Sequence, residues 1–183
     1  MSIVCCKVTE GFIHIASDSI SVRGYTQTKS INSHSKLDRI GRMIIGSCGF
    51  TEESTLFQSY CSTHSINDNY KRKINQIEML NYITEFAKWK KQRTDKFDIK
   101  NVYILIYGNQ IFHIEGFLVE EILDYEAIGA GMDYALASLY LGKDVDKAVE
   151  TACELSIYCS LPIVEYIINK KTYQITKVKH EEK

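Results

Sequence analysis

The most informative stretch of this sequence is Ser2–Asp18, which reads SIVCCKVTEGFIHIASD. Residues 2–8 are apolar and rich in β-branched side chains, and residues 12–18 alternate apolar with small or polar side chains. A short polar turn that contains Gly11 joins the two runs, and this combination is typical of a β-hairpin. The chain is therefore expected to begin with two antiparallel strands.

The same patterns predict strands and helices along the rest of the chain. Paired short strands are expected at 36–40 and 43–46, 102–107 and 111–114, and 163–168 and 173–176. Helices are expected from Thr51, which can act as the N-cap, and at 76–92, 132–140 and 144–159. Residues 18–35 are polar, so a loop or an irregular edge is expected there. Hairpins imply antiparallel sheets, which two helix pairs can cover, giving a layered α+β domain.

Composition indicates one compact globular domain over residues 1–183, with a frayed charged tail at 179–183. Hydrophobic residues make up 45% and charged residues 25% of the chain. The 22 basic and 23 acidic side chains give a net charge of −1, so no positive field attracts nucleic acid. The lysine-rich end of the second predicted helix is interpreted as solvated and not as a nucleic-acid patch; it comprises Lys88, Lys90, Lys91 and Arg93.

The cysteines favour a reducing compartment. There are six, Cys5, Cys6, Cys48, Cys61, Cys153 and Cys159, without a C-x-x-C pair or a Cys/His spacing suited to zinc. The N-terminus does not resemble a secretion signal, and no apolar run approaches the ~18 residues of a membrane span. A cytoplasmic protein is therefore expected, with no metal, no cofactor and no membrane contact. A nucleophilic cysteine partnered by one of the five histidines is an alternative.

The N-terminus also carries candidate chemistry. Met1 precedes a small residue, Ser2, so removal of Met1 is expected to leave serine as the first residue. A terminal serine combines a hydroxyl nucleophile with an α-amine of pKa about 7.7–8.0, which can act as a base. The hairpin returns Asp18 to within reach of Ser2, and Lys36 begins the next strand. A lysine held by an aspartate can lower the proton affinity of the nucleophile.

Four blocks of the sequence resemble the proteasome β-type subunits, and specifically the bacterial HslV-type peptidase. These blocks are 2–11, Ile15-Ala16-Ser17-Asp18-Ser19 with Gly24, 36–51 with its Ile45-Gly46-Ser47-Cys48-Gly49 turn, and 127–160. The resemblance covers most of the chain in order and is weakest at 60–100. Members of this family are N-terminal nucleophile hydrolases. The resemblance implies a four-layer α-β-β-α sandwich, with two antiparallel sheets between helix pairs.

The resemblance also implies a site and partners. Ser2 takes the place of the nucleophile, Asp18 and Lys36 those of its acidic and lysine partners, Gly46 that of the oxyanion donor, and Cys48 and Val22 those of substrate-pocket residues. By the same resemblance the chain hydrolyses peptide bonds inside a homo-oligomeric ring. An ATP-driven AAA+ unfoldase that feeds unfolded polypeptide into the ring is the expected partner.

Three departures from the family pattern keep other functions open. Serine replaces the usual threonine at Ser2, Ala130 stands where many relatives have serine, and Glu154 stands where aspartate is usual. One alternative is a catalytically silent scaffold or binding subunit, and another is an amide hydrolase for small molecules. The family can hold a monovalent cation on backbone carbonyls, which would lie here around Cys153, Ser156 and Cys159. The Gly129/Gly131 pair lacks the third glycine and the Lys-Ser/Thr of a nucleotide loop.

Overall fold

The structure is a computed structural model that describes residues 2–23, 26–29, 36–67 and 69–180. Its strands are β1 (Val4–Val8), β2 (Phe12–Ser17), β3 (Ile20–Arg23), β4 (Thr26–Lys29), β5 (Leu37–Ile40), β6 (Met43–Cys48), β7 (Val102–Tyr107), β8 (Gln110–Glu115), β9 (Leu118–Glu121), β10 (Tyr125–Ile128), β11 (Ile163–Asn169) and β12 (Ile175–His180). The helices are α1 (Thr51–Thr63), α2 (Gln76–Thr94), α3 (Met132–Tyr140) and α4 (Val145–Leu155).

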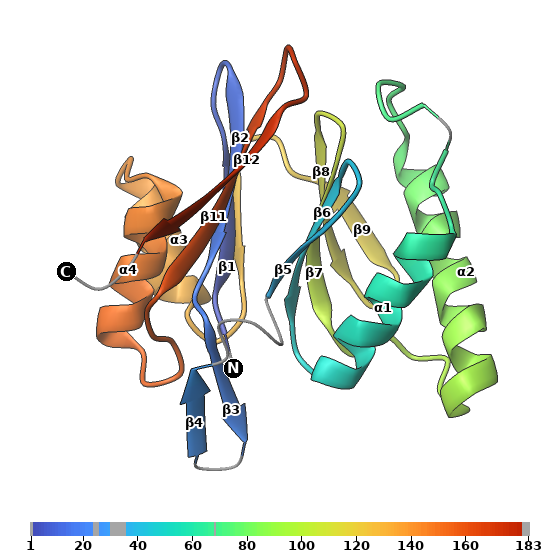
Figure 1. Cartoon of the computed structure of the whole chain (residues 1–183), viewed down its shortest axis with the longest axis horizontal. Coiled ribbons are helices and arrows are strands. Elements are labelled where there is room, and N and C mark those ends of the chain that lie inside the picture. Colours follow the sequence, from blue (N-terminus) through green and yellow to red (C-terminus); the bar gives the residue numbers. More distant parts are fainter. Residues whose placement is uncertain (1, 24–25, 30–35, 68, 181–183) are drawn as a thin grey trace.

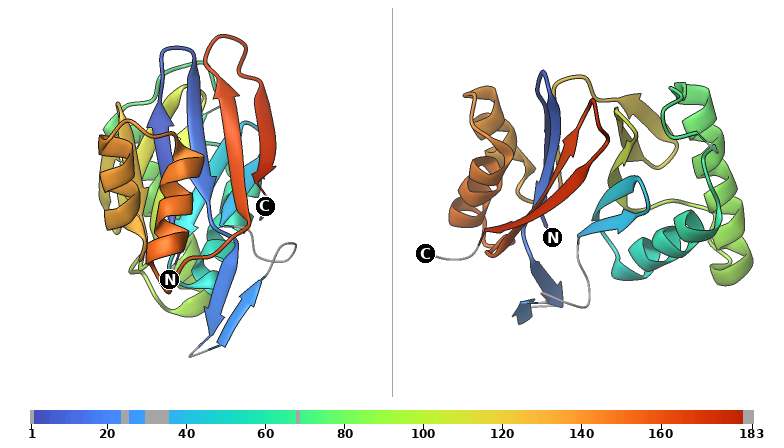
Figure 2. Two further views of the ribbon diagram at one scale, coloured as in Figure 1. Left: turned by 90° about the vertical axis from the view of Figure 1, so that its left-hand side faces the viewer. Right: turned by 45° about the horizontal axis from the view of Figure 1, so that its top comes forward.

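Two five-stranded antiparallel sheets lie face to face between two helix pairs (Figure 1). One sheet has the order β10-β1-β2-β11-β12 and is covered by α3 and α4. The other has the order β5-β6-β7-β8-β9 and is covered by α1 and α2. The β3–β4 hairpin forms a separate two-stranded sheet that extends beyond the main body (Figures 1 and 2). The predicted α-β-β-α sandwich is thus confirmed.

The opening hairpin supplies two of the three hydrophobic cores, because successive side chains on a strand point to opposite faces. Ile3 and Cys5 pack against the small residues of α3 and α4. Val4 and Cys6 pack in the middle core between the two sheets. The third core lies between α1, α2 and the β5–β9 sheet, and its buried rings include Phe57, Tyr60, Phe86, Tyr103 and Phe112.

Gly46 has a packing role at the centre of the middle core. A Cβ built on Gly46 would lie 2.6 Å from Val4 Cγ1, on the opposite sheet, and 3.2 Å from Leu37 Cδ2. The distance of 2.6 Å to Val4 is shorter than any ordinary carbon–carbon contact. The missing side chain therefore lets the two sheets approach each other beside the start of β1.

Several boundaries differ from the predictions. Residues 18–35 were expected to be a loop or an irregular edge, but the structure forms the regular strands β3 and β4 there; 24–25 and 30–35 lie outside the described residues. The helix at 144–159 ends at Leu155, and the residues after it form a loop. Lys179 and His180 belong to β12 and pair with Val164 and Ile163 instead of fraying, whereas 181–183 lie outside the described residues.

Two predicted helix ends are wrong. Thr51 is the first residue of α1 and not its N-cap, which is Phe50, and Phe50 has no capping side chain of its own. Lys90, expected in a solvated helix end, is 3% exposed and pairs with Glu53 on α1. Lys90 lies one turn after Phe86, so the helical period carries it onto the buried face. Among the described residues, no helix has the length and apolarity needed to cross a bilayer.

Candidate active site

The end of β2 brings Asp18 beside the start of β1. Val4 pairs with Ser17, and Asp18 and Ile3 follow as the next opposing residues. The Ile3 N–H donates to Asp18 Oδ1 at 3.0 Å, and the Asp18 N–H donates to the Ile3 carbonyl at 3.3 Å. The carboxyl group of Asp18 is therefore fixed against the peptide that directly follows Ser2.

Lys36 completes a buried ion pair with this carboxyl group. Its ammonium contacts Asp18 Oδ1, and the two side chains are 10% and 0% exposed, respectively. Burial raises the pKa of the Asp18 carboxyl above its ordinary value, and the Lys36 charge opposes this rise. Among the described residues, the other oxygen, Oδ2, accepts one long bond of 3.4 Å, from the N–H of Ser160 in the loop after α4.

Ser2 and Cys48 are neighbours across the two sheets. The Cys48 thiol donates to the Ile128 carbonyl at 3.5 Å and is also hydrogen-bonded with the Ser2 side chain. A Cβ on Gly129 would lie 2.4 Å from the Ser2 carbonyl oxygen and 2.8 Å from Cys48 Sγ. The Gly131 N–H donates to the same Ser2 carbonyl at 3.2 Å. The Gly129–Gly131 turn thus holds the backbone of Ser2, which is 6% exposed.

The Cys48 thiol is a weak acid in this position. Burial raises its pKa to about 12, while the Lys36 charge and the hydrogen bond with Ser2 oppose the rise less strongly. A thiol with so high a pKa carries almost no thiolate at neutral pH and is a poor nucleophile. Because Cys48 lies beside Ser2, it fits the role of a residue that lines the site.

Gly46 does not join this cluster. The Ser47 N–H donates to the carbonyl of Lys36, which directly precedes β5. The N–H of Gly46, one residue earlier, therefore points the opposite way, to its partner Ile104 on β7. That N–H lies in the middle of a sheet. Extended by one residue beyond the end of β6, the same alternation predicts that the N–H of Gly49 faces the Lys36 side.

Val22 belongs to the small two-stranded sheet that follows Asp18. It is half-buried on β3, where it pairs with Gln27 in the small two-stranded sheet. Met1 lies outside the described residues.

The sequence patterns missed two groups that hydrogen-bond to the residues around this site. They are the Ser160 N–H on Asp18 and the side chain of Asn101, which bonds the backbone of Phe50. Asn101 immediately precedes the apolar run of β7, and a polar residue that is 0% exposed there must have hydrogen-bond partners. In the part of the chain that the structure describes, no group of His, Cys, Asp and Glu side chains is arranged to hold a metal ion.

Solved structures share this architecture at low sequence identity. BPH from Thiobacillus denitrificans superposes with a TM-score of 0.80 at 17% identity, over 93% of this chain and 99% of that one. The same protein in complex with epoxomicin gives a TM-score of 0.77 at 19% identity, over 92% and 99% of the two chains. HslV from Trypanosoma brucei gives 0.67 at 19% identity, over 91% and 99%. No protein-family model and no curated protein matches the sequence.

These similarities show that the chain has the fold of HslV and BPH, as the resemblance of its sequence blocks implies. They extend over nearly the whole length of each compared chain. At such identities the likeness concerns the fold, and the chemistry of the site must be argued from its own residues.

Proposed function

We propose that this chain is a peptidase whose nucleophile is the hydroxyl of Ser2, with the α-amine of Ser2 as its base after removal of Met1. The observation that carries the proposal is the Asp18 carboxyl group, which binds both the Lys36 ammonium and the Ile3 N–H. This arrangement places a buried cation beside the first strand residues. A nearby cation favours the deprotonated forms of both the hydroxyl and the amine.

In the proposed reaction, Ser2 Oγ attacks the peptide carbonyl and its proton passes to the Ser2 amine. The amine then donates this proton to the leaving amine, and water hydrolyses the ester in a second step. The oxyanion needs a fixed N–H donor, and we assign this role to Gly49 in place of Gly46, because the Gly46 N–H points into the sheet. Such a donor is typically worth about 3–4 kcal/mol in the transition state.

Intact-mass spectrometry and a fluorogenic peptide assay test the proposal. The mature chain should lack Met1, and Ser2→Ala should reduce hydrolysis to background. Ser19→Ala is a matched control, since Ser19 directly follows Asp18 and, among the described residues, its hydrogen bond runs from its backbone N–H to the Ser160 carbonyl. Retention of Met1, or activity that survives Ser2→Ala, would contradict the mechanism. BPH has been solved with epoxomicin, so this compound is a further probe of Ser2.

Two observations favour the second candidate, a silent scaffold of the same fold. The Ser2 side chain already has the Cys48 thiol as a hydrogen-bonding neighbour, and Glu154, which stands where aspartate is usual, is exposed on α4. A chain that loses Met1 and still fails to cleave any peptide in a broad panel would support this candidate.

We further propose that copies of the chain form a ring that encloses the Ser2 sites, as the HslV-like fold suggests. Large apolar side chains are exposed where α3 begins and α4 ends, close to the loop that contacts Asp18: Met132, Leu155, Ile157 and Tyr158. Exposed apolar groups of this kind favour association. Light scattering coupled to gel filtration should give a multiple of 21.0 kDa.

The proposed partner of such a ring is an AAA+ unfoldase that supplies unfolded polypeptide. ATP-dependent degradation of a folded substrate by the two proteins together tests this proposal.

A further inference from the structure

The turn Gly49–Phe50 follows Cys48, and through it the backbone leaves the Ser2 site for α1. We propose that Asn101 is a positioning residue that fixes this turn, and with it the Gly49 N–H, for the reaction at Ser2. The proposal rests on the function proposed above. It adds the residue that immediately precedes β7, and a second buried ion pair, to the machinery.

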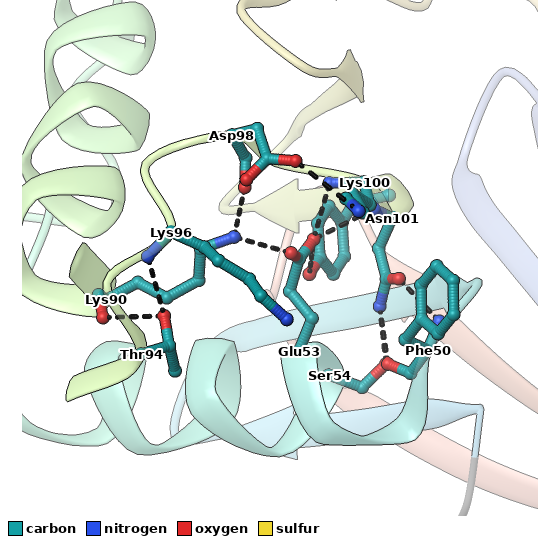
Figure 3. A network of polar contacts seen from close by, with 10 residues as sticks. Phe50, Glu53, Ser54, Lys90, Thr94, Lys96, Asp98, Lys100 and Asn101 are labelled. Carbon is teal, nitrogen blue, oxygen red and sulfur yellow. Dashed lines mark hydrogen bonds and ion pairs between the residues drawn. The ribbon is translucent and has the colours of Figure 1, made fainter.

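The amide of Asn101 binds both backbone groups of Phe50 (Figure 3). Its Oδ1 accepts the Phe50 N–H at 2.6 Å, and its Nδ2 donates to the Phe50 carbonyl at 2.8 Å. Nδ2 also donates to Ser54 Oγ, one turn into α1, at 3.0 Å. A planar amide that satisfies a donor and an acceptor of one residue fixes the direction of that peptide. It also satisfies the N–H of the N-cap residue, one of the N–H groups at the start of α1 that have no partner within the helix.

The backbone of Gly49 is shaped around the same side chain. Gly49 has φ +139°, and a Cβ built on it would lie 2.1 Å from Asn101 Oδ1. The Asn101 amide therefore occupies the space of any side chain at position 49, and the φ value is one that other residues rarely adopt. Asn101 and Gly49 together define one conformation of the turn.

Asn101 is in turn fixed by the buried carboxylate of Glu53 on α1. Glu53 Oε1 accepts the N–H of Asn101 at 2.8 Å and that of Lys100 at 3.0 Å. Glu53 Oε2 accepts the Lys90 ammonium at 2.6 Å. Figure 3 shows these groups converging on Glu53 from α2 and from the start of β7. The contacts form a continuous chain from Lys90 through Glu53 and Asn101 to the turn.

This rigidity matters because an oxyanion donor works only in a fixed place. Displacement of such a group by about 1 Å can cost about 10²-fold in rate. Ground-state substrate contacts are less sensitive to the direction of one N–H. Loss of the Asn101 bonds should therefore lower kcat much more than it changes KM.

Asn101→Asp provides a test with a built-in rescue. At pH 8 the introduced carboxylate faces the Phe50 carbonyl without a proton to donate, and kcat should fall about ten- to a hundredfold with KM within about threefold. Once protonated, the carboxyl group donates to the Phe50 carbonyl and accepts the Phe50 N–H, as the amide does. The ratio of variant to unsubstituted kcat should thus rise as the pH falls to 5.5.

The exposed Asn109→Asp is the matched control for the same change of charge, and its kcat ratio should stay near one at every pH. Circular dichroism checks that each variant is folded. If Asn101→Asp does not fold, Ser54→Ala removes one bond of the same amide and should lower kcat about two- to fivefold. If Asn101→Asp folds and its kcat is unchanged, the proposed role of Asn101 is wrong, while the proposed function of Ser2 stands. The same holds for an unchanged kcat in Ser54→Ala, where that variant is tested instead. A kcat ratio that does not respond to pH also overturns the role of Asn101. Absence of any Ser2-dependent hydrolysis in the unsubstituted chain overturns instead the proposed function.

Discussion

Asp18–Lys36 and Glu53–Lys90 are both buried lysine–carboxylate pairs, but their carboxylates are satisfied to different degrees. Glu53 accepts three N–H or ammonium donors within 3.0 Å and lies 3.4 Å from the Tyr103 hydroxyl. Within the described part of the chain, Asp18 concentrates its short bonds on one oxygen, and the other makes the 3.4 Å contact with Ser160. Pairs of the same chemistry therefore serve two purposes. Glu53–Lys90 joins α1, α2 and the start of β7, whereas Asp18–Lys36 lies beside the candidate nucleophile in the middle of the fold.

The largest effect should follow from Lys36→Met. This change removes the cation beside Ser2, and Ser2-dependent kcat/KM should fall about 10²–10⁴-fold, the range for groups that assist proton transfer. It also leaves Asp18 buried without its partner. Activity within about threefold of the unsubstituted chain would remove Lys36 from the mechanism.

The pH dependence of unfolding supplies a second measurement on the same variant. Burial already raises the pKa of Asp18, and loss of Lys36 removes the main opposing charge. A carboxyl group whose folded pKa lies above its unfolded value destabilises the fold when it is ionised. The stability deficit of Lys36→Met should therefore be greatest at neutral pH and should shrink as the pH falls toward 4.

Lys90→Met should act mainly on stability. Removal of one partner from a buried pair typically costs about 3–5 kcal/mol, since it leaves an uncompensated charge. Urea unfolding measures this loss, and kcat per folded molecule should fall far less than in Lys36→Met. If Lys90→Met proved as inactive as Lys36→Met when corrected for folding, the distinction between the two pairs would be lost.

The double variant Glu53→Gln with Lys90→Met separates an orphaned charge from lost packing. A neutral amide still accepts the N–H groups of Lys100 and Asn101, so part of the loss should be regained. A recovery of about 1–3 kcal/mol relative to Lys90→Met is expected. No recovery would mean that the lysine stem contributes through its packing.

The central strands and the four-layer order follow from the sequence, whereas most of the missed structure lies at edges. β1, β2, β6 and β7 carry apolar side chains on both faces because each lies between two layers. β9 and the end of β12 are edge strands, with charged residues such as Lys177 and Lys179 that prevent further pairing. Hydrophobic patterns do not detect such strands.

For the candidate site, local sequence was informative only where neighbours along the hairpin were also neighbours in space. The closeness of Asp18 to the start of β1 follows from hairpin geometry. Asn101 meets Phe50 across 51 residues of chain, and Ser160 meets Asp18 across 142. The direction of an N–H such as that of Gly46 depends on strand register, which a single sequence does not define.

The smallest effect is expected at a third pair, His113 and Glu126, which joins the two sheets at a partly exposed position. Glu126 lies 3.8 Å from His113 Nδ1, and this carboxylate raises the pKa of His113. A raised histidine pKa adds stability that is complete below the unfolded value of about 6.5 and is lost as the pH rises through the folded pKa. Solvent screens this pair, so His113→Gln should cost less than about 1 kcal/mol of folding stability at pH 5.5 and still less at pH 8.5.

Urea midpoints at the two pH values measure this difference. Glu126→Gln should reproduce it, and the double variant should lose no more stability than either single variant. A cost that is equal at both pH values would mean that His113 acts by packing. A cost as large as that of Lys90→Met would mean that burial does not determine the strength of these pairs.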